Sequence, residues 1–369
     1  MSFFNVIVPL HNSAHTLSDL LNSVVAQNED IEVIIANDNS TDGWKSVVKK
    51  FNKKLNITVV DCDIPEGKHC PGNTRQCGLE KATGEWITFI DHDDVFVPDT
   101  FKKVREAIER DKHQYLLLTE FKEVNPETLE VIKEYDVINR LTWMHGKFYN
   151  KKNLIDKYGL HMCKDLLTHE DVYFNHNLVV LQQLEPDIQK EMVYYPICTY
   201  YWKAWPNSTS RTWGSDFIYD HMDDYIISLS KPYFDIIERW MQEEANALGA
   251  KNNVDTVSIT EVIAEVEAKH KAFMDSTRKQ AMNDLISMYF YFQGDRAKRG
   301  DRCNWYSYQC ISEYIKKCNQ ELSMTRDAIV YSVMGNYHWY ETAKKACFIA
   351  TGEFIEVTSF KDFMYNIML

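Results

Sequence analysis

The sequence lacks a long hydrophobic run and has fewer basic residues than acidic residues. No segment reaches the ~18 apolar residues that a membrane-spanning helix needs. The N-terminal segment Met1–Asn5 has no basic region of the kind that begins a secretory signal. The formal net charge of −13 disfavours a protein that coats nucleic acid. We therefore expect a cytoplasmic protein with no integral membrane segment.

The cysteines lack the spacing of a metal site. Nine are scattered along the chain and no pair is separated as CxxC, so neither a zinc site nor a disulfide scaffold is predicted. A reducing environment fits this usage best. Hydrophobic residues make up 45% of the 369 residues, which is enough for a buried core and for two domains.

The first hundred residues alternate short apolar runs with helical patterns. The predicted strands are 4–10, 31–36, 57–60 and 86–90. The predicted helices between them are 13–26, 44–55 and 77–82. This alternation predicts an α/β fold with a mostly parallel sheet and helices on both faces.

The pattern changes farther along the chain. The predicted elements up to residue 215 are strands at 115–119, 131–136 and 193–202 and a helix within 166–180. After Trp213 long helical patterns follow, with further helices predicted at 305–317 and 325–348. We place a boundary near residue 215, between an α/β domain, 1–215, and a helical domain, 216–369.

A cluster of carboxylates follows the fourth predicted strand. Asp91, Asp93 and Asp94 end the apolar run of Trp86–Ile90, and ligands bind at the carboxyl ends of strands in open α/β folds. These carboxylates repel one another unless a cation lies among them, and oxygen ligands favour Mg²⁺ or Mn²⁺. The alternative is an acidic turn before the helix that Val97–Thr100 begins.

Several segments occur in an order that resembles a known family. They are 6–12, 32–43, 72–78, 82–87, the acidic cluster, 143–149 and 168–174. In this order and spacing they resemble the family 2 glycosyltransferases of the GT-A fold, over roughly the first 210 residues. The resemblance implies a GT-A fold, a nucleotide-sugar donor and an inverting transfer of the sugar.

The resemblance implies a nucleotide pocket near the N-terminus, lined by Pro9, His11 and Asn12. Asp38 matches the carboxylate that hydrogen-bonds uracil or a similar base, although the neighbouring position 37, usually an acid, is asparagine here. Arg75 would contact the diphosphate or hold the acidic cluster. An Asx-rich turn at Asp38 and a surface arginine at a helix start are the alternatives.

The resemblance also assigns the metal and the base. Asp91–His92–Asp93 matches the DXD motif, so Asp93 would be the main ligand of Mn²⁺ or Mg²⁺ and Asp91 a second ligand or a ribose contact. Asp94 is the member expected to be structural. Asp171 matches the general base that deprotonates the acceptor hydroxyl. A helix N-terminus, with Thr168 as cap, is compatible with this role.

Two polar segments leave their roles open. Lys203 and Arg211 would close over the diphosphate, or belong to a polar surface loop. The basic stretch 294–308 lies next to aromatic residues, a composition that binds phosphates or unstacked bases, or forms an exposed turn.

These features together predict a metal-dependent inverting glycosyltransferase. It would move a sugar, from UDP by default, to a hydroxyl acceptor that is expected to be a glycan. The domain 216–369 would shape the acceptor site or form a homodimer interface. A transferase acting on a hydroxymethylated DNA base and a catalytically silent nucleotide-sugar-binding module remain as rivals. A nucleotidyltransferase is disfavoured, since no glycine-rich signature followed by a basic pair lies near the N-terminus.

Overall fold

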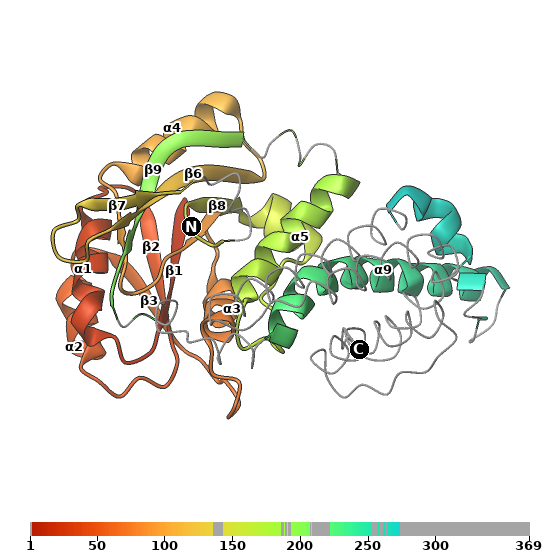
Figure 1. Cartoon of the computed structure of the whole chain (residues 1–369), viewed down its shortest axis with the longest axis horizontal. Helices are drawn as coiled ribbons and strands as arrows, with labels where there is room; N and C mark the ends of the chain where they lie inside the picture. Colours follow the sequence, from red (N-terminus) through yellow and green to blue (C-terminus); the bar gives the residue numbers. More distant parts are fainter. Residues whose placement is uncertain are drawn as a thin grey trace, which may run out of the picture. The chain divides into compact units, whose positions relative to one another are not determined.

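The computed structural model describes two compact units. The described residues are 2–135, 143–185, 188, 190, 193–206, 208, 222–252, 257–258, 261–262 and 264–273. The units comprise residues 1–213 and 214–369 (Figure 1). Each is considered by itself below.

The first unit is built on one mixed sheet. Its strands lie in the order β3-β2-β1-β4-β8-β6-β9-β5, and β7 pairs with β6. Their bounds are β1 Phe4–Leu10, β2 Ile31–Asn37, β3 Asn56–Asp61, β4 Trp86–Phe89, β5 Val95–Phe96, β6 Leu116–Val124, β7 Val131–Glu134, β8 Lys147–Asn150 and β9 Val193–Lys203. The first four strands are parallel to one another, which confirms the alternating pattern read from the sequence. Strand β8 pairs antiparallel with β4 and β6 and closes the parallel part.

Helices cover both faces of this sheet (Figure 1). Their bounds are α1 Ala14–Val25, α2 Trp44–Phe51, α3 Pro71–Lys81, α4 Thr100–Asp111, the π-helix η2 Lys151–Asp156 and α5 Glu170–Leu184. Phe4 of β1 packs edge-on against Phe101 of α4. Ile7, which lies on the opposite face of β1, contacts Gly78 of α3. Alternate residues of β1 therefore contact helices on opposite sides, as a buried parallel strand requires.

Helix α3 begins six residues earlier than the sequence predicted. Cys70 caps it, since its sulfur accepts from Asn73 N, and Pro71 occupies the first turn, where its missing N–H costs nothing. The first turn buries polar residues, which a search for apolar periodicity does not detect. Helix α5 also differs in its cap: His169, at φ 58°, precedes it in place of Thr168.

Two cysteines form a disulfide that the sequence did not predict. Cys62 follows β3 and Cys77 lies on α3, with their Cα atoms 5.9 Å apart. The expectation of no disulfide is therefore wrong for this pair. A sequence separation of 15 gives no motif, because it is the packing of α3 against the sheet that brings the two residues together.

The buried amide of Asn5 fixes the turn that leads into β4. Its Oδ1 accepts from the backbone N–H groups of Thr83 and Gly84 at 2.8 and 2.6 Å. Its Nδ2 donates to Glu32 Oε2 at 3.1 Å. A Cβ on Gly84 would lie 2.8 Å from Asn5 Cγ, so this turn needs glycine.

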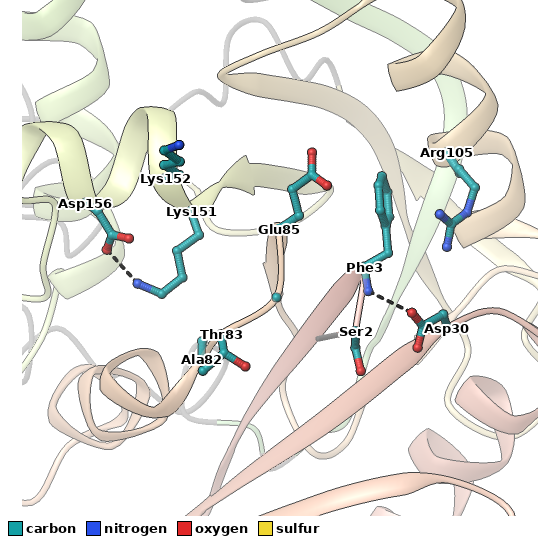
Figure 2. Close-up of a pocket in the computed structure, with 11 residues that line it drawn as sticks. Ser2, Phe3, Asp30, Ala82, Thr83, Glu85, Arg105, Lys151, Lys152 and Asp156 are labelled. Carbon is teal, nitrogen blue, oxygen red and sulfur yellow. Dashed lines mark hydrogen bonds and ion pairs between the residues drawn. The ribbon is translucent and has the colours of Figure 1, made fainter.

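A cavity of about 780 Å³ lies at the edge of the sheet where β1 and β4 begin (Figure 2). Two of its charged residues, Lys151 and Asp156, pair with each other. Lys151 Nζ lies 2.6 Å from Asp156 Oδ1, and the backbone N–H of Phe3 donates to Asp30 at 3.1 Å. The guanidinium of Arg105 stacks 4.0 Å from the centre of the Phe3 ring.

The described part of the second unit is helical, as expected. Helix α9 spans Met222–Asn252. On it, Trp240 stacks on His270 with ring centres 3.6 Å apart. Among the residues that the structure describes, no helix is long and apolar enough to cross a membrane. The helices predicted at 305–317 and 325–348 and the basic stretch 294–308 lie outside the described residues.

Candidate active site

The sheet has a topological switch point at β1. From β1 the chain passes to β2 and β3 on one side and returns to β4 on the other. In open α/β sheets this reversal opens a crevice at the carboxyl ends of the strands, where ligands bind. His11 follows β1, Asp38 follows β2 and the acidic cluster follows β4. The fold therefore brings three of the predicted segments to one edge.

The predicted nucleotide residues meet on one side of the crevice. Pro9 is buried within β1. His11 Nδ1 lies 2.6 Å from the backbone oxygen of Asp38. Asn12 has a left-handed backbone, φ 48°, and its side-chain oxygen accepts from Thr41 N at 2.8 Å. These bonds hold the loops after β1 and β2 together.

The carboxylate of Asp38 has a partner that sequence reasoning missed. His69 Nδ1 lies 2.6 Å from Asp38 Oδ1. The carboxylate is buried, with 5% of its side chain exposed, whereas 38% of the His69 side chain is exposed. No periodic or motif signal marked His69, because it lies in the loop before α3.

Asp94 has a structural position, in line with the expectation. It is 1% exposed, and its carboxylate accepts from Tyr200 OH at 2.5 Å and from Lys203 N at 2.7 Å, which ties it to β9. Burial raises the pKa of Asp94 well above its ordinary value, and the negative charges of Asp93 and Asp91 raise it further.

Asp93 is a member of the cluster whose ionised form a cation would stabilise. Burial raises its pKa, His92 partly offsets this, and the charge of Asp91 raises it again. Among the described residues no three His, Cys, Asp or Glu side chains form a ready metal cage. Mg²⁺ and Mn²⁺ sites shared with phosphates need only one or two carboxylates. The residues present therefore fit a metal bound together with a diphosphate.

Arg75 links the acidic cluster to α5. It is 6% exposed, and its two terminal nitrogens lie 2.5 Å from Asp91 Oδ1 and 2.5 Å from Glu170 Oε1. Burial alone would raise the pKa of Asp91, but Arg75, His145 and His92 together more than offset this, and the pKa lies below its ordinary value. Arg75 is thus no surface arginine; it holds the cluster, one of the two roles expected for it.

Helices α3 and α5 approach closely at this ion pair. A Cβ on Gly72 would lie 2.5 Å from Glu170 Cγ, so only glycine fits there. Glu170 itself was not among the predicted site residues. Its adjacency to Asp171 in the first turn of α5 was the available signal, but the sequence alone does not show which of the two faces Arg75.

Asp171 lies in the first turn of α5, as expected. Burial raises its pKa to about 7, and the neighbouring charge of Glu170 acts in the same direction. A carboxylate with this pKa can accept a proton near neutral pH. Its backbone oxygen accepts from Asn175 Nδ2 at 2.9 Å, and Asn175 Oδ1 accepts from Tyr149 OH at 2.7 Å.

Lys203 lies at the end of β9 rather than in a surface loop. It is 3% exposed, and its ammonium lies 2.8 Å from Asp19 Oδ2 of α1. The alternative of a polar surface loop does not hold at this residue, because its backbone N–H bonds to the buried Asp94. Arg211, the other cation predicted to close over the diphosphate, lies outside the described residues.

Comparison with known proteins identifies the class of this domain. The family model of Glycosyl transferase family 2 matches residues 5–164. The match lies in the region where the sequence resembles that family, which confirms the predicted resemblance.

Two curated relatives act on the same kind of polymer, by their names. The poly(ribitol-phosphate) beta-N-acetylglucosaminyltransferase TarS of Staphylococcus aureus (strain Mu50) is 30% identical over 181 residues, 48% of this chain and 30% of TarS. The poly(ribitol-phosphate) beta-glucosyltransferase of Bacillus spizizenii is 34% identical over 94 residues, 24% of this chain and 14% of the relative. The matched segment thus covers less than a third of either relative.

Solved structures share the fold. The crystal structure of residues 1–349 of S. aureus TarS in complex with UDP superposes with a TM-score of 0.54 at 16% identity, over 96% of this chain and 93% of that one. The complex of the same protein with UDP-GlcNAc gives a TM-score of 0.50 at 20% identity, over 82% of this chain and 93% of that one. The predicted GT-A fold is confirmed.

Proposed function

We propose that this protein is an inverting, metal-dependent glycosyltransferase that uses a nucleotide-sugar donor. The observation that carries the proposal is the double ion pair of Arg75. It joins the carboxylates after β4 to the first turn of α5, so the donor side and the proposed base Asp171 lie around one buried guanidinium.

The donor would lie across the switch point, with its base toward Asp38 and its diphosphate toward the acidic cluster. UDP is the favoured nucleotide, since the similar TarS structures were solved with UDP and with UDP-GlcNAc. His11, Asn12 and Pro9 would form the floor of the base pocket. Lys203 lowers the pKa of Asp93, which supports a role for this cation beside the diphosphate.

Asp93, with Asp91 as a second oxygen donor or ribose contact, would hold the Mn²⁺ or Mg²⁺. When bound, such an ion neutralises charge that develops on a departing diphosphate. The raised pKa of Asp93 supports this role, because a buried carboxylate beside other carboxylates is costly to ionise without a cation.

Asp171 would take the proton from the acceptor hydroxyl. A general base works best when its pKa lies near the operating pH, and burial brings the pKa of Asp171 to about 7. The acceptor is a hydroxyl of a glycan or of a polyol-phosphate polymer like those named for the two relatives. We place the reaction in the cytoplasm and assign residues 216–369 to the acceptor site or to a dimer interface.

A panel of nucleotide sugars tests the donor assignment. The protein is heated with each candidate, with and without Mn²⁺, and its melting temperature is recorded. A ligand that binds the native state stabilises it, by about 2.7 kcal/mol at a hundred times its Kd. We expect a UDP-sugar with Mn²⁺ to give the largest rise. No rise with any nucleotide sugar would overturn the proposal.

Two substitutions separate the roles. Asp93→Asn should abolish the Mn²⁺-dependent part of donor binding, as measured by calorimetry. Asp171→Asn should retain donor binding and lose transfer, by about 10²–10⁴-fold for a general base. Transfer by Asp171→Asn at near the wild-type rate would place the base elsewhere.

A further inference from the structure

A buried lysine lies close to the proposed base and has no role so far. Lys147 on β8 is 1% exposed. Its ammonium donates to the backbone oxygen of Trp143, which accepts a hydrogen bond but carries no compensating charge. Burial of an ammonium is costly unless a counter-charge lies nearby. The face of β8 on which Lys147 lies indicates which element supplies this counter-charge.

Successive residues of β8 face opposite sides of the sheet. Phe148 contacts the ring of Phe101 on α4, with centres 5.7 Å apart. Tyr149 contacts the ring of Phe174 on α5, with centres 5.4 Å apart. Residues two apart on a strand share a face. Lys147 therefore lies on the face of Tyr149, the one that packs against α5.

Tyr149 also fixes the first turn of α5. Its hydroxyl donates to Asn175, which in turn donates to the backbone oxygen of Asp171. The same strand therefore orders the backbone of Asp171 through Tyr149 and carries, on the same face, the buried ammonium of Lys147. The other charged or titratable groups that act on Asp171 or respond to its charge are Glu170, Arg75 and Tyr149.

The titration of the two groups agrees with this geometry. Burial lowers the pKa of Lys147 to about 7, and Asp171 is the charge that counteracts it. Burial raises the pKa of Asp171 to about 7, and Arg75 and Lys147 both act against that rise. Arg75 is already shared between Asp91 and Glu170. Of these two cations, Lys147 is the one that pairs with no other carboxylate within the described part of the chain.

We propose that Lys147 is a positioning residue for the transfer: its buried ammonium, presented by β8 to the first turn of α5, keeps Asp171 in the ionised form that accepts the acceptor's proton. The inference rests on the proposed function of Asp171. It adds a second, separate element, β8, to the parts of the fold that set the reactivity of the site.

The test compares Lys147→Met, which keeps the shape of the side chain and removes the charge, with Lys147→Arg, which keeps the charge. The readout is the pH dependence of kcat. A nearby cation lowers the pKa of a carboxyl group by about 1–3 units. We expect Lys147→Met to move the acidic limb of the profile upward, by up to about one pH unit. Lys147→Arg should keep the acidic limb at its wild-type pH.

Lys151→Met is the matched control. Lys151 also follows β8 in the chain, but it pairs with Asp156 at the opposite edge of the sheet (Figure 2). The Lys151→Met substitution should leave the pH profile of kcat unchanged. A lower kcat in Lys147→Met with the acidic limb in its wild-type place would show a packing role alone and overturn the proposal.

A stability measurement covers the case in which Lys147→Met folds poorly. A carboxyl group with a raised pKa binds its proton more tightly when folded, so it destabilises the fold as the pH rises. Between about pH 6 and about pH 9, Lys147→Met should lose more thermal stability than the double variant Lys147→Met/Asp171→Asn, in which no carboxylate is left. Parallel loss in the two variants, or failure of both to fold, would overturn the proposal.

The outcomes also separate this inference from the proposed function. If Asp171→Asn transfers sugar at the wild-type rate, Asp171 is not the base, whatever the pH profile of the lysine variants. If Asp171→Asn is inactive and Lys147→Met keeps the wild-type acidic limb, the base assignment stands and only the role of Lys147 falls.

Discussion

Arg75 is the residue on which the candidate site depends most directly. Its buried guanidinium pairs with carboxylates from two distant segments of the chain, Asp91 and Glu170. Replacement by an apolar side chain leaves both carboxylates without their cation. Breaking a buried ion pair by removing one partner costs about 3–5 kcal/mol.

Arg75→Met should therefore lower the free energy of unfolding by about 3–5 kcal/mol, measured by urea denaturation. Arg110→Met is the control, because Arg110 pairs with Asp111 at the surface, where 65% of its side chain is exposed. The control should change stability very little, because solvent screens an ion pair at the surface. Equal effects of the two substitutions would contradict the structural role of Arg75.

Asp171 also predicts the pH dependence of the reaction. Its pKa of about 7 means that the carboxyl group is protonated, and unable to act as a base, at lower pH. The rate should therefore fall about tenfold per pH unit below that value and level off above it. A steady-state kcat profile in Mn²⁺ measures this. A profile that stays flat down to about pH 5 would exclude Asp171 as the titrating base.

Helix α3 is the element that holds the site together. It carries Arg75, packs against the sheet through Gly78 and is joined to the end of β3 by the disulfide of Cys62 and Cys77. Closing a loop of 15 residues stabilises a fold by about 3 kcal/mol, chiefly by restricting the unfolded chain.

Loss of this tether should be measurable. Cys77→Ser, or reduction of the wild type, should lower the free energy of unfolding by about 2–4 kcal/mol. The control is Cys163→Ser, which removes a buried thiol that forms no disulfide in the described part of the chain. Reductant should change the stability of Cys163→Ser and not of Cys77→Ser. A response of both to reductant would mean that another cysteine pair is involved.

Three of the strands that the sequence predicted share one property. Strands β1, β2 and β4 are almost entirely buried, so their residues form continuous apolar runs. Strand β8 was missed because its buried residues include Lys147 and Asn150, which periodicity counts as surface. The start of α3 was missed for the same reason. Buried polar residues whose partners lie in distant segments follow no local pattern of hydrophobicity.

The candidate site shows the same division. Its carboxylates could be named from short motifs after strands. The partners that set their chemistry, His69, Glu170 and Lys147, lie 31, 95 and 24 positions from the carboxylates or the arginine that they act on. Only the folded sheet brings these residues together, and no regular spacing in the sequence predicts the pairs.

The molecule as a whole divides near residue 213. Every residue of the main hydrophobic core, from Phe4 to Tyr200, belongs to the first unit. A unit with its own core is expected to fold independently.

A protein ending at residue 213 should therefore unfold in a single cooperative transition and retain metal-dependent donor binding, as measured by calorimetry. If residues 216–369 shape the acceptor site, this shortened protein should hydrolyse the donor slowly but fail to transfer sugar. A shortened protein that is unfolded would show that the first unit needs the second for stability. Full transfer activity would remove the acceptor role from the second unit.

The hydrogen bonds that Asn5 makes to the turn before β4 and to Glu32 require a neutral amide. Deamidation would change one atom of the side chain and turn it into aspartate. The new carboxylate would face Glu32, to which the amide now donates, and the burial of two like charges side by side is strongly unfavourable. A stored sample that gains one negative charge at this position should melt earlier than a fresh one, with no change in the shape of any side chain.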